Sequence, residues 1–161
     1  MQNAIRSFTS DGGNVLVSGA YIATDIWDQV YPVEIDKEFR EKSKKFAQNV
    51  LGYRWGAGFA SRRAEMKPTA NKVFTPLQDK KYAIHHEINE ECYCVENPDG
   101  IVPASRNGAT ILRYTDTEVS AGICHQGNGY KTTCFGFPLE TLKDSRQMNE
   151  LFRSTLEYFN R

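Results

Sequence analysis

The sequence predicts an α/β domain in which helices cover both faces of a layered sheet. A helix-like opening leads directly into a short aliphatic strand, "NVLVS". The last third combines three consecutive strand candidates, "ATILRYT", "VSAGICHQ" and "GYKTTCFGF", with a long amphipathic closing helix over about 140–159. Helices and strands that follow one another in this way are typical of α/β layers. We expect a single domain over residues 1–161.

The opening residues predict a helix that stops at a glycine pair. Ile5 and Phe8 lie at helical spacing, and Gly12-Gly13 suits the left-handed residue that ends a helix. A doubly wound domain would place a strand before this helix. We therefore expect the chain to be the C-terminal part of a longer protein, with an N-terminal strand or strands lacking and one sheet edge exposed.

Two further helices are predicted before Gly52. A four-residue apolar repeat over residues 22–30 indicates a short helix that ends at Pro32. A clearer helix over about 37–51 begins after Asp36, a good N-cap, and ends at Gly52. Its predicted inward stripe comprises Phe39, Ser43, Phe46 and Val50.

Periodicity weakens over residues 53–76, where short strands are expected around 53–57 and 72–74. The simplest interpretation is a long excursion over the surface. Because a loop of this length is uncommon within a compact domain, it also suggests the border of a site. Arg62 and Arg63 would then face an anionic ligand.

The composition favours a ligand held in a pocket over a highly charged partner. Twenty Lys and Arg residues balance twenty Asp and Glu residues, so the formal net charge is zero. This balance gives no broad attraction to nucleic acid or to anionic lipid. No apolar run approaches the roughly 20 residues of a membrane helix. We expect no nucleic-acid partner, no membrane span and no cofactor.

The cysteines do not form a metal-binding pattern. Cys92 and Cys94 lack a second pair at zinc-site spacing. A hairpin that turns at Gly127-Asn128 puts Cys124 and Cys134 on opposite faces of the sheet, which excludes a disulfide between them. We expect no metal site and interpret all four cysteines as small buried apolar residues.

Three stretches carry a resemblance to a known family. They are "GGNVLVSGAYIATD", "FAQNVLGYRW" and "VENPDGIVPASRNGATILRYTDTEVSAGICHQGNGYKTTCFGFPLET", followed by the closing helix. Together they resemble the C-terminal domain of bacterial multidomain secreted proteins labelled xanthan lyase-like, which has the class I glutamine amidotransferase-like fold. The resemblance implies a flavodoxin-like sheet between helices, a secreted or cell-envelope location, and a parent protein related to polysaccharides.

The resemblance places Ser18 at a strand-to-helix elbow, where active members of the amidotransferase fold carry a cysteine. Phe137 and Pro138 then stand roughly where the catalytic base would be, with Glu140 where its orienting acid would be. Phe137 cannot accept a proton, and an unassisted serine hydroxyl is a weak nucleophile. Two roles for Ser18 stay open: a cap for the helix that begins near Gly19, or a nucleophile.

Two function classes follow. The first is a non-catalytic amidotransferase-like module that contacts other domains of its parent protein or binds a carbohydrate or other small ligand. Its predicted ligand-binding residues are Gly19, Tyr21, Asp25, Trp27, Trp55 and Arg62. The alternative is a divergent serine hydrolase in which His125 or His86 activates Ser18, with Asp25, Asp28 or Glu140 orienting the base. The exposed sheet edge would also permit a homodimer.

Overall fold

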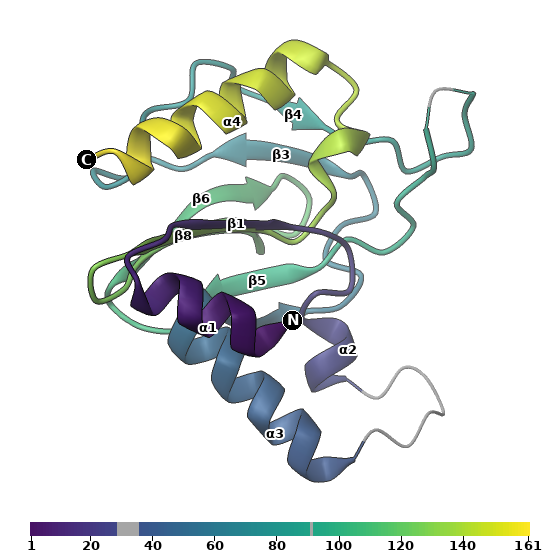
Figure 1. Cartoon of the computed structure of the whole chain (residues 1–161). Coiled ribbons are helices and arrows are strands. Elements are labelled where there is room, and N and C mark those ends of the chain that lie inside the picture. Colours follow the sequence, from purple (N-terminus) through teal and green to yellow (C-terminus); the bar gives the residue numbers. More distant parts are fainter. Residues whose placement is uncertain (29–35, 91) are drawn as a thin grey trace.

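A curled, mixed sheet lies at the centre of the molecule, with helices on both of its faces (Figure 1). The computed structural model describes residues 1–28, 36–90 and 92–161. Within these residues the helices are α1 (Gln2–Ser10), α2 (Thr24–Trp27), α3 (Lys37–Phe46) and α4 (Ser145–Phe159), with a π-helical turn at Ala47–Leu51 and a 3₁₀ turn at Leu139–Thr141. The strands are β1 (Val15–Ser18), β2 (Tyr53–Ala57), β3 (Glu65–Pro68), β4 (Tyr82–Ala83), β5 (Gly100–Pro103), β6 (Gly108–Tyr114), β7 (Ser120–Gln126) and β8 (Lys131–Phe135). The predicted α/β class is confirmed at this broad level.

The strand order explains the shape of the sheet. In the described residues the main sheet runs β1-β8-β7-β6-β3-β4, and β2 pairs with β5 separately. β1 and β8 are parallel, with Val15 opposite Thr132 and Ser18 opposite Phe135. The other neighbouring strands of this sheet run antiparallel. β1 is therefore an edge strand, joined to the sheet by its pairing with β8.

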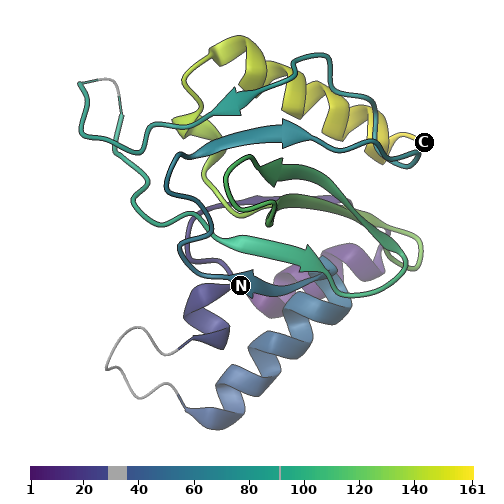
Figure 2. The same ribbon diagram turned by 180° about the vertical axis from the view of Figure 1, so that it is seen from behind.

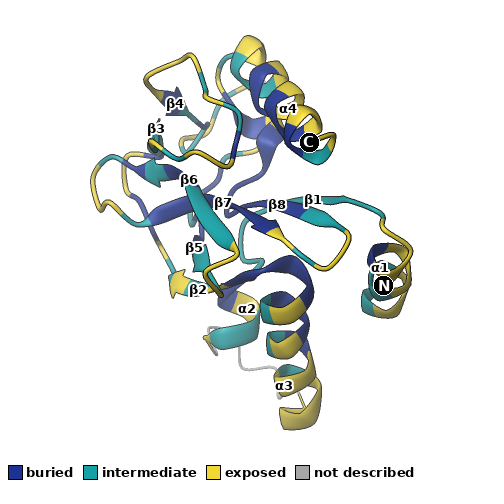
Figure 3. Cartoon of the chain, turned by 90° about the vertical axis from the view of Figure 1, so that its left-hand side faces the viewer, coloured by how far each residue is buried: buried dark blue, intermediate teal, exposed yellow. Residues whose placement is uncertain are grey.

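Helix α4 lies on one side of the sheet and α2 and α3 lie on the other (Figures 2 and 3), and an apolar cluster fills each side. On one face, Leu151 and Tyr158 of α4 belong to a cluster against which Leu16 packs. On the other face, Phe46 of α3 belongs to a second cluster, against which Val17 packs. Adjacent residues of β1 contribute to different clusters because side chains alternate along a strand.

α3 forms where the sequence predicts it. The Asp36 carboxylate accepts a hydrogen bond from the Glu38 backbone N–H at 3.1 Å, and Glu38 pairs with Lys42 one turn later at 2.7 Å. The last five residues before Gly52 form a π-helical turn, so the predicted range is correct but its final turn is wider than an α-helix. Phe39 is 58% exposed, and its predicted place in the inward stripe is wrong.

α2 is shorter than the predicted helix, and Ser18 does not cap it. The helix begins at Thr24, with Ala23 at the N-cap position. Ser18 lies six residues earlier, as the last residue of β1. The predicted cap is therefore wrong. The part of the predicted helix that continues toward Pro32 falls among residues 29–35, outside the described residues.

The β7–β8 hairpin is confirmed, with a longer loop than predicted. Gln126 lies opposite Lys131, so the loop spans 127–130. Each residue of β7 therefore lies opposite a residue of β8 two positions later than predicted. Because side chains alternate with a period of two, every side chain still points to the predicted face of the sheet. Cys124 and Cys134 belong to the two different apolar clusters, and all four cysteines are free. Cys92 and Cys94 are half-buried, so the prediction that all four are buried is wrong for this pair.

The segment between β2 and β5 differs most from the prediction. No strand forms at 72–74; the Asn71 carboxamide oxygen instead accepts hydrogen bonds from the Val73 and Phe74 backbone N–H groups. The strand that joins the sheet here is β3, which pairs with β6 on one side and β4 on the other.

α4 covers the face of the sheet opposite α1 and α3 (Figure 1). The Asp144 carboxylate accepts a hydrogen bond from the Arg146 backbone N–H at 2.9 Å, which satisfies one free donor of the first turn. The predicted closing helix forms, but it begins at Ser145 and not near residue 140, and its apolar residues are only partly buried. Leu151 is buried, whereas Phe152 and Leu156 are exposed.

Candidate functional site

The connections that follow β1 and β8 meet at the carboxyl ends of these two parallel strands. The Gly19 backbone N–H donates to the Phe135 carbonyl at 3.2 Å. The Ser18 hydroxyl oxygen accepts a hydrogen bond from the Leu139 backbone N–H at 3.4 Å. In α/β sheets, ligands commonly bind outside the carboxyl ends of parallel strands. This end is therefore the first place to look for a site.

Tyr21 is the strained residue of the connection between β1 and α2. Its φ of +61° lies in the left-handed region, which non-glycine residues seldom adopt. A nucleophile elbow places its functional side chain on a strained strand-to-helix turn of this kind. Here Gly19 and Ala23 stand two residues on either side, so the strained turn is centred on Tyr21 and not on Ser18. Strain held at one residue costs about 1–3 kcal/mol and often marks a functional site.

A pocket of about 310 Å³ opens beside this turn. It is lined by Ala20, Tyr21, Tyr93, Cys94, Val95, Glu96 and Asn97. The Asn97 side-chain amide donates to the Tyr21 hydroxyl. The Tyr93 hydroxyl donates to the Glu140 carboxylate at 2.7 Å, which brings this predicted site residue to the pocket rim. We call this group of residues, together with Glu140, the tyrosine pocket.

Tyr93 is the most exposed aromatic side chain of the tyrosine pocket, at 56%. Partial burial, followed by its hydrogen bond to Glu140, raises the pKa of the Tyr93 hydroxyl to about 12. The hydroxyl is therefore neutral at physiological pH and acts as a hydrogen-bond donor. Its ring is open to solvent at the same time, which leaves a face that a ligand can cover.

Asp99 organises the backbone behind the pocket. Its side chain is 1% exposed and accepts hydrogen bonds from the Ala23 N–H at 2.6 Å and the Thr24 N–H at 3.1 Å. The Thr24 hydroxyl donates to the same carboxylate at 2.5 Å. These N–H groups begin α2 and would otherwise be unpaired. Asp99 therefore performs the capping role that was one of the two open for Ser18.

The position of Asp99 depends on close backbone contacts with Gly136, the residue that follows β8. The Asp99 N–H donates to the Gly136 carbonyl at 2.7 Å, and a Cβ atom at Gly136 would lie 2.1 Å from the Asp99 carbonyl oxygen. Only glycine permits this approach. Burial raises the pKa of the Asp99 carboxyl, and its hydrogen bonds with Thr24 and Ala23 oppose part of that increase.

The two tryptophans assigned to ligand binding support α2 instead of lining the pocket. The Trp55 indole N–H donates to the Thr24 hydroxyl at 3.2 Å, extending the hydrogen-bond chain from Asp99. The Trp27 and Tyr53 rings lie 6.3 Å apart, and both tryptophans pack against the α3-side apolar cluster. Both side chains are half-buried.

Asp25 and Arg62 also lie outside the residues that line the pocket. Asp25 is exposed in the first turn of α2, and partial burial raises the pKa of its carboxyl. The Arg62 backbone N–H donates to the Asp116 carboxylate at 2.9 Å. Arg62 itself is exposed. Of the six predicted ligand-binding residues, Tyr21 lines the pocket, and Gly19 directly precedes Ala20, another lining residue.

Ser18 and His125 are not brought together. Ser18 pairs with Phe135, which pairs with Gly122, and His125 lies three residues farther along β7. Strand geometry then separates the two Cα atoms by roughly 14 Å. The side chain of His86 does not serve Ser18 either, because its Nδ1 atom is buried without a hydrogen-bond partner and its Nε2 atom lies 3.9 Å from Glu87.

His125 occupies the opposite end of the strand pair. It lies against Gly52, whose φ is +82° and whose added Cβ would be 2.1 Å from the imidazole Cγ atom. Burial lowers the pKa of His125, and its Nδ1 atom has no hydrogen-bond partner in the described structure. His125 therefore packs as a neutral ring at the hairpin end.

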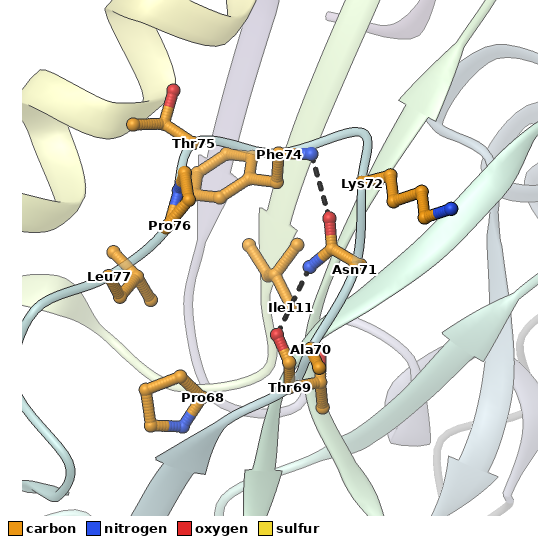
Figure 4. A pocket seen from close by; sticks show the side chains of 10 residues that line it. All are labelled: Pro68, Thr69, Ala70, Asn71, Lys72, Phe74, Thr75, Pro76, Leu77 and Ile111. Atoms are coloured by element: carbon orange, nitrogen blue, oxygen red, sulfur yellow. Dashed lines mark hydrogen bonds between the residues drawn. The ribbon is translucent and has the colours of Figure 1, made fainter.

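A larger pocket of about 530 Å³ lies between residues 68–77 and β6 (Figure 4). Its walls are mainly apolar, with Phe74 and Ile111 among them. The Asn71 side chain turns toward its own loop, where its amide also donates to the Thr69 carbonyl at 3.4 Å. This polar group therefore holds the loop itself.

Sequence reasoning missed Tyr93, Asn97 and Asp99. They lie in a stretch without clear periodicity, and long-range contacts bring them to the end of β1. The available signal was local: an acidic residue follows "ENP" directly before the short strand β5. That signal indicates a turn and does not reveal which helix the carboxylate caps.

Comparison of the chain with protein-family models, with curated proteins and with solved structures gave no match. In the described part of the chain, no helix is long and apolar enough to cross a membrane. The same residues contain no group of three or more His, Cys, Asp or Glu side chains arranged to hold a metal ion.

Proposed function

We propose that this domain is a non-catalytic binding module that takes a small saccharide in the tyrosine pocket. The observation that carries the proposal is an exposed aromatic ring beside convergent polar groups at the carboxyl ends of β1 and β8. Sugars combine apolar C–H faces with many hydroxyl groups. A site that offers both an aromatic surface and hydrogen-bonding groups suits both features.

Each group of the pocket has a role in this proposal. The Tyr93 ring stacks on the apolar face of a sugar, and the carboxylates of Glu96 and Glu140 accept hydrogen bonds from its hydroxyl groups. The Asn97 amide supplies both donor and acceptor capacity. At about 310 Å³ the pocket lies at the small end of ligand sites, which favours one or two sugar rings.

The proposal excludes nucleophilic chemistry by Ser18 because the hydroxyl has no base. Its hydrogen-bond partner is the Leu139 N–H, and the two histidines proposed as bases do not hydrogen-bond to it. Without a base the serine hydroxyl stays a weak nucleophile. We further propose that the module belongs to a larger secreted or cell-envelope protein, as the resemblance of the sequence implies.

Calorimetric titration with glucose, mannose, cellobiose and maltose tests the binding function. We expect at least one sugar to bind and Tyr93→Ala to weaken that binding at least tenfold. Phe39→Ala is the matched control, because Phe39 is similarly exposed but lies on α3 and does not line the pocket. Absence of heat with all four sugars, or equal losses in the two variants, would count against the proposal.

A further inference from the structure

The tyrosine pocket carries negative charge in a chain whose charges balance. The whole sequence has twenty basic and twenty acidic residues. Two glutamates belong to the pocket: Glu96 lines it, and Glu140 stands at its rim, where it accepts the hydrogen bond from Tyr93. The other described residues that line the pocket include no Lys, Arg or His. The negative charge of the pocket is therefore a local feature of this site.

The two pocket glutamates also lack the basic partners that other glutamates have. Glutamates elsewhere on the molecule form ion pairs with Lys or Arg, namely Glu38, Glu41, Glu65, Glu118 and Glu157. Within the described residues, neither Glu96 nor Glu140 takes part in an ion pair. A cationic ligand can supply the countercharge that the fold does not place beside them.

Both carboxylates keep oxygen atoms that can accept hydrogen bonds from a ligand. The Tyr93 hydroxyl donates to Oε1 of Glu140 at 2.7 Å, and Oε2 has no hydrogen-bond partner among the described residues. Glu96 is exposed, and no described group donates a hydrogen bond to its carboxylate. An ammonium group carries positive charge and only donates hydrogen bonds. It therefore matches these carboxylates in both charge and hydrogen bonding.

The tyrosine side chains favour a cation as well. Tyr21 and Tyr93 both line the pocket, and Tyr93 is 56% exposed. The face of an aromatic ring carries partial negative charge and attracts ammonium groups. Because the Tyr93 hydroxyl is bonded to Glu140, a ligand that covers this ring also lies near that carboxylate. Ring and carboxylate can therefore act on the same ligand group.

We propose that the saccharide taken by the tyrosine pocket is an amino sugar with a free, protonated amine. This inference rests on the proposed function and names the class of sugar that the site selects. The ammonium group lies against the Tyr93 ring and donates hydrogen bonds to Glu96 and Glu140. A neutral sugar gains no charge pairing here, and the two carboxylates repel an acidic sugar.

The remaining polar group of the pocket distinguishes an amino sugar from other cations. The Asn97 amide donates to the Tyr21 hydroxyl, and its carbonyl oxygen can accept a hydrogen bond from a sugar hydroxyl beside the amine. A simple alkylammonium ion and a lysine side chain carry no such hydroxyl group. The volume of about 310 Å³ also suits one or two sugar rings.

Calorimetric titration with two matched disaccharides tests the inference. Cellobiose is compared at about pH 6 with its diamino analogue, in which a protonated amine replaces one hydroxyl group of each ring. We expect the diamino disaccharide to bind about tenfold more tightly than cellobiose. Raising the salt concentration from about 20 mM to about 300 mM should reduce this preference, because salt screens exposed charges. Acetylation of both amines, which removes their charge, should abolish the preference.

Variants of the two glutamates identify the source of the preference. Glu96→Gln and Glu140→Gln keep an acceptor oxygen and remove the charge, so each should weaken binding of the diamino disaccharide severalfold and change cellobiose binding little. Glu38→Gln is the matched control, because Glu38 is an exposed glutamate on α3 that does not line the pocket. It should leave the preference unchanged, and circular dichroism should show that all three variants are folded.

The outcomes separate failure of this inference from failure of the binding function. Equal affinities for the two disaccharides, both lost in Tyr93→Ala, would overturn the amino-sugar assignment and leave saccharide binding intact. Binding of neither disaccharide would refute the binding function and this inference with it. If tetramethylammonium or trilysine binds as tightly as the diamino disaccharide, the pocket recognises an ammonium group without a sugar, and the assignment is wrong.

Discussion

The two ends of the β1–β8 pair use buried polar groups in opposite ways. At the carboxyl end, Asp99 is buried and accepts three hydrogen bonds from the start of α2. At the hairpin end, His125 is also buried, but its Nδ1 atom has no hydrogen-bond partner and its ring is held by contact with Gly52. The Asp99 side chain is held by hydrogen bonds, and the His125 ring by steric contact with Gly52.

The difference shows that a buried polar residue can organise the backbone at one end of a strand pair and fill space at the other. The buried Asp99 carboxylate accepts the hydrogen bonds of the first N–H groups of α2. The side chains of Tyr93 and Asn97 are therefore not needed for this and line the pocket. At the other end the histidine itself fills space. A polar residue near a strand end is therefore poor evidence of function until its partners are known.

The largest expected effect comes from removing the carboxylate at the pocket end. Asp99→Ala leaves two buried N–H groups and the Thr24 hydroxyl without their acceptor, and we expect a loss of about 4 kcal/mol in the free energy of unfolding. Urea unfolding followed by circular dichroism measures this loss. Asp144→Ala is the control, because it removes an exposed cap from α4 and should cost about 1 kcal/mol. Equal losses of unfolding free energy in the two variants would show that the buried Asp99 stabilises the fold no more than an exposed helix cap does.

At the hairpin end, Gly52→Ala should cost about 3 kcal/mol. The added methyl group must occupy a left-handed backbone position and would overlap the His125 ring. Combining it with His125→Ala, which vacates that space, should recover part of the loss. A double-mutant cycle by urea unfolding checks this coupling, and strictly additive losses would contradict a steric fit.

The pH dependence of the unfolding free energy gives a further test of the buried Asp99 carboxyl. Burial raises the pKa of Asp99, so the folded chain holds its proton at pH values where the unfolded chain, with a pKa of about 3.9, has released it. The stability of the native chain relative to Asp99→Asn is therefore greatest below pH 3.9. It should fall as the pH rises through the higher folded pKa.

Urea unfolding of both proteins between pH 3 and 7 measures that difference. The unfolding free energy of Asp99→Asn should increase relative to that of the native chain as the pH increases. Asp25, which raises the Asp99 pKa through its own charge, provides a second check, because Asp25→Asn should reduce the pH dependence. A difference that stays constant over this range would mean that Asp99 titrates as an ordinary exposed carboxyl.

The smallest effect is expected at Ser18. Ser18→Ala removes the acceptor of one long hydrogen bond from Leu139 and should cost less than about 1 kcal/mol. Native protein and variant should both stay unlabelled by a serine-directed fluorophosphonate probe, as judged by gel fluorescence. Labelling of the native chain that disappears in the variant would restore the hydrolase alternative.

Periodicity predicted the elements whose folding depends on local sequence. α3, α4 and the β7–β8 hairpin follow from amphipathic spacing, caps and a glycine-containing turn. β3 and β4 did not follow, because short strands are stabilised by distant partners such as Tyr114 opposite Met66. The prediction at 72–74 failed because the Asn71 side chain folds that stretch into a loop.

The candidate site was predictable only in outline. Ser18, the last residue of β1, and Gly19, which follows it, correctly indicated a turn near the end of a parallel strand. The strained residue proved to be Tyr21, because the chain continues past Ser18 before it turns into α2. No local pattern could connect that turn with Asp99, which lies 75 residues from Thr24 in the sequence.

We propose that the carboxyl end of the β1–β8 pair binds ligand and that the hairpin end does not. Two-dimensional NMR of the ¹⁵N-labelled chain, titrated with the sugar that gives the strongest calorimetric signal, tests it most directly. The backbone amides of Ala20, Tyr21 and Asn97 should shift in a saturable way, while those of His125 and Gln126 stay unchanged. Saturable shifts confined to His125 and Gln126 would contradict the claim.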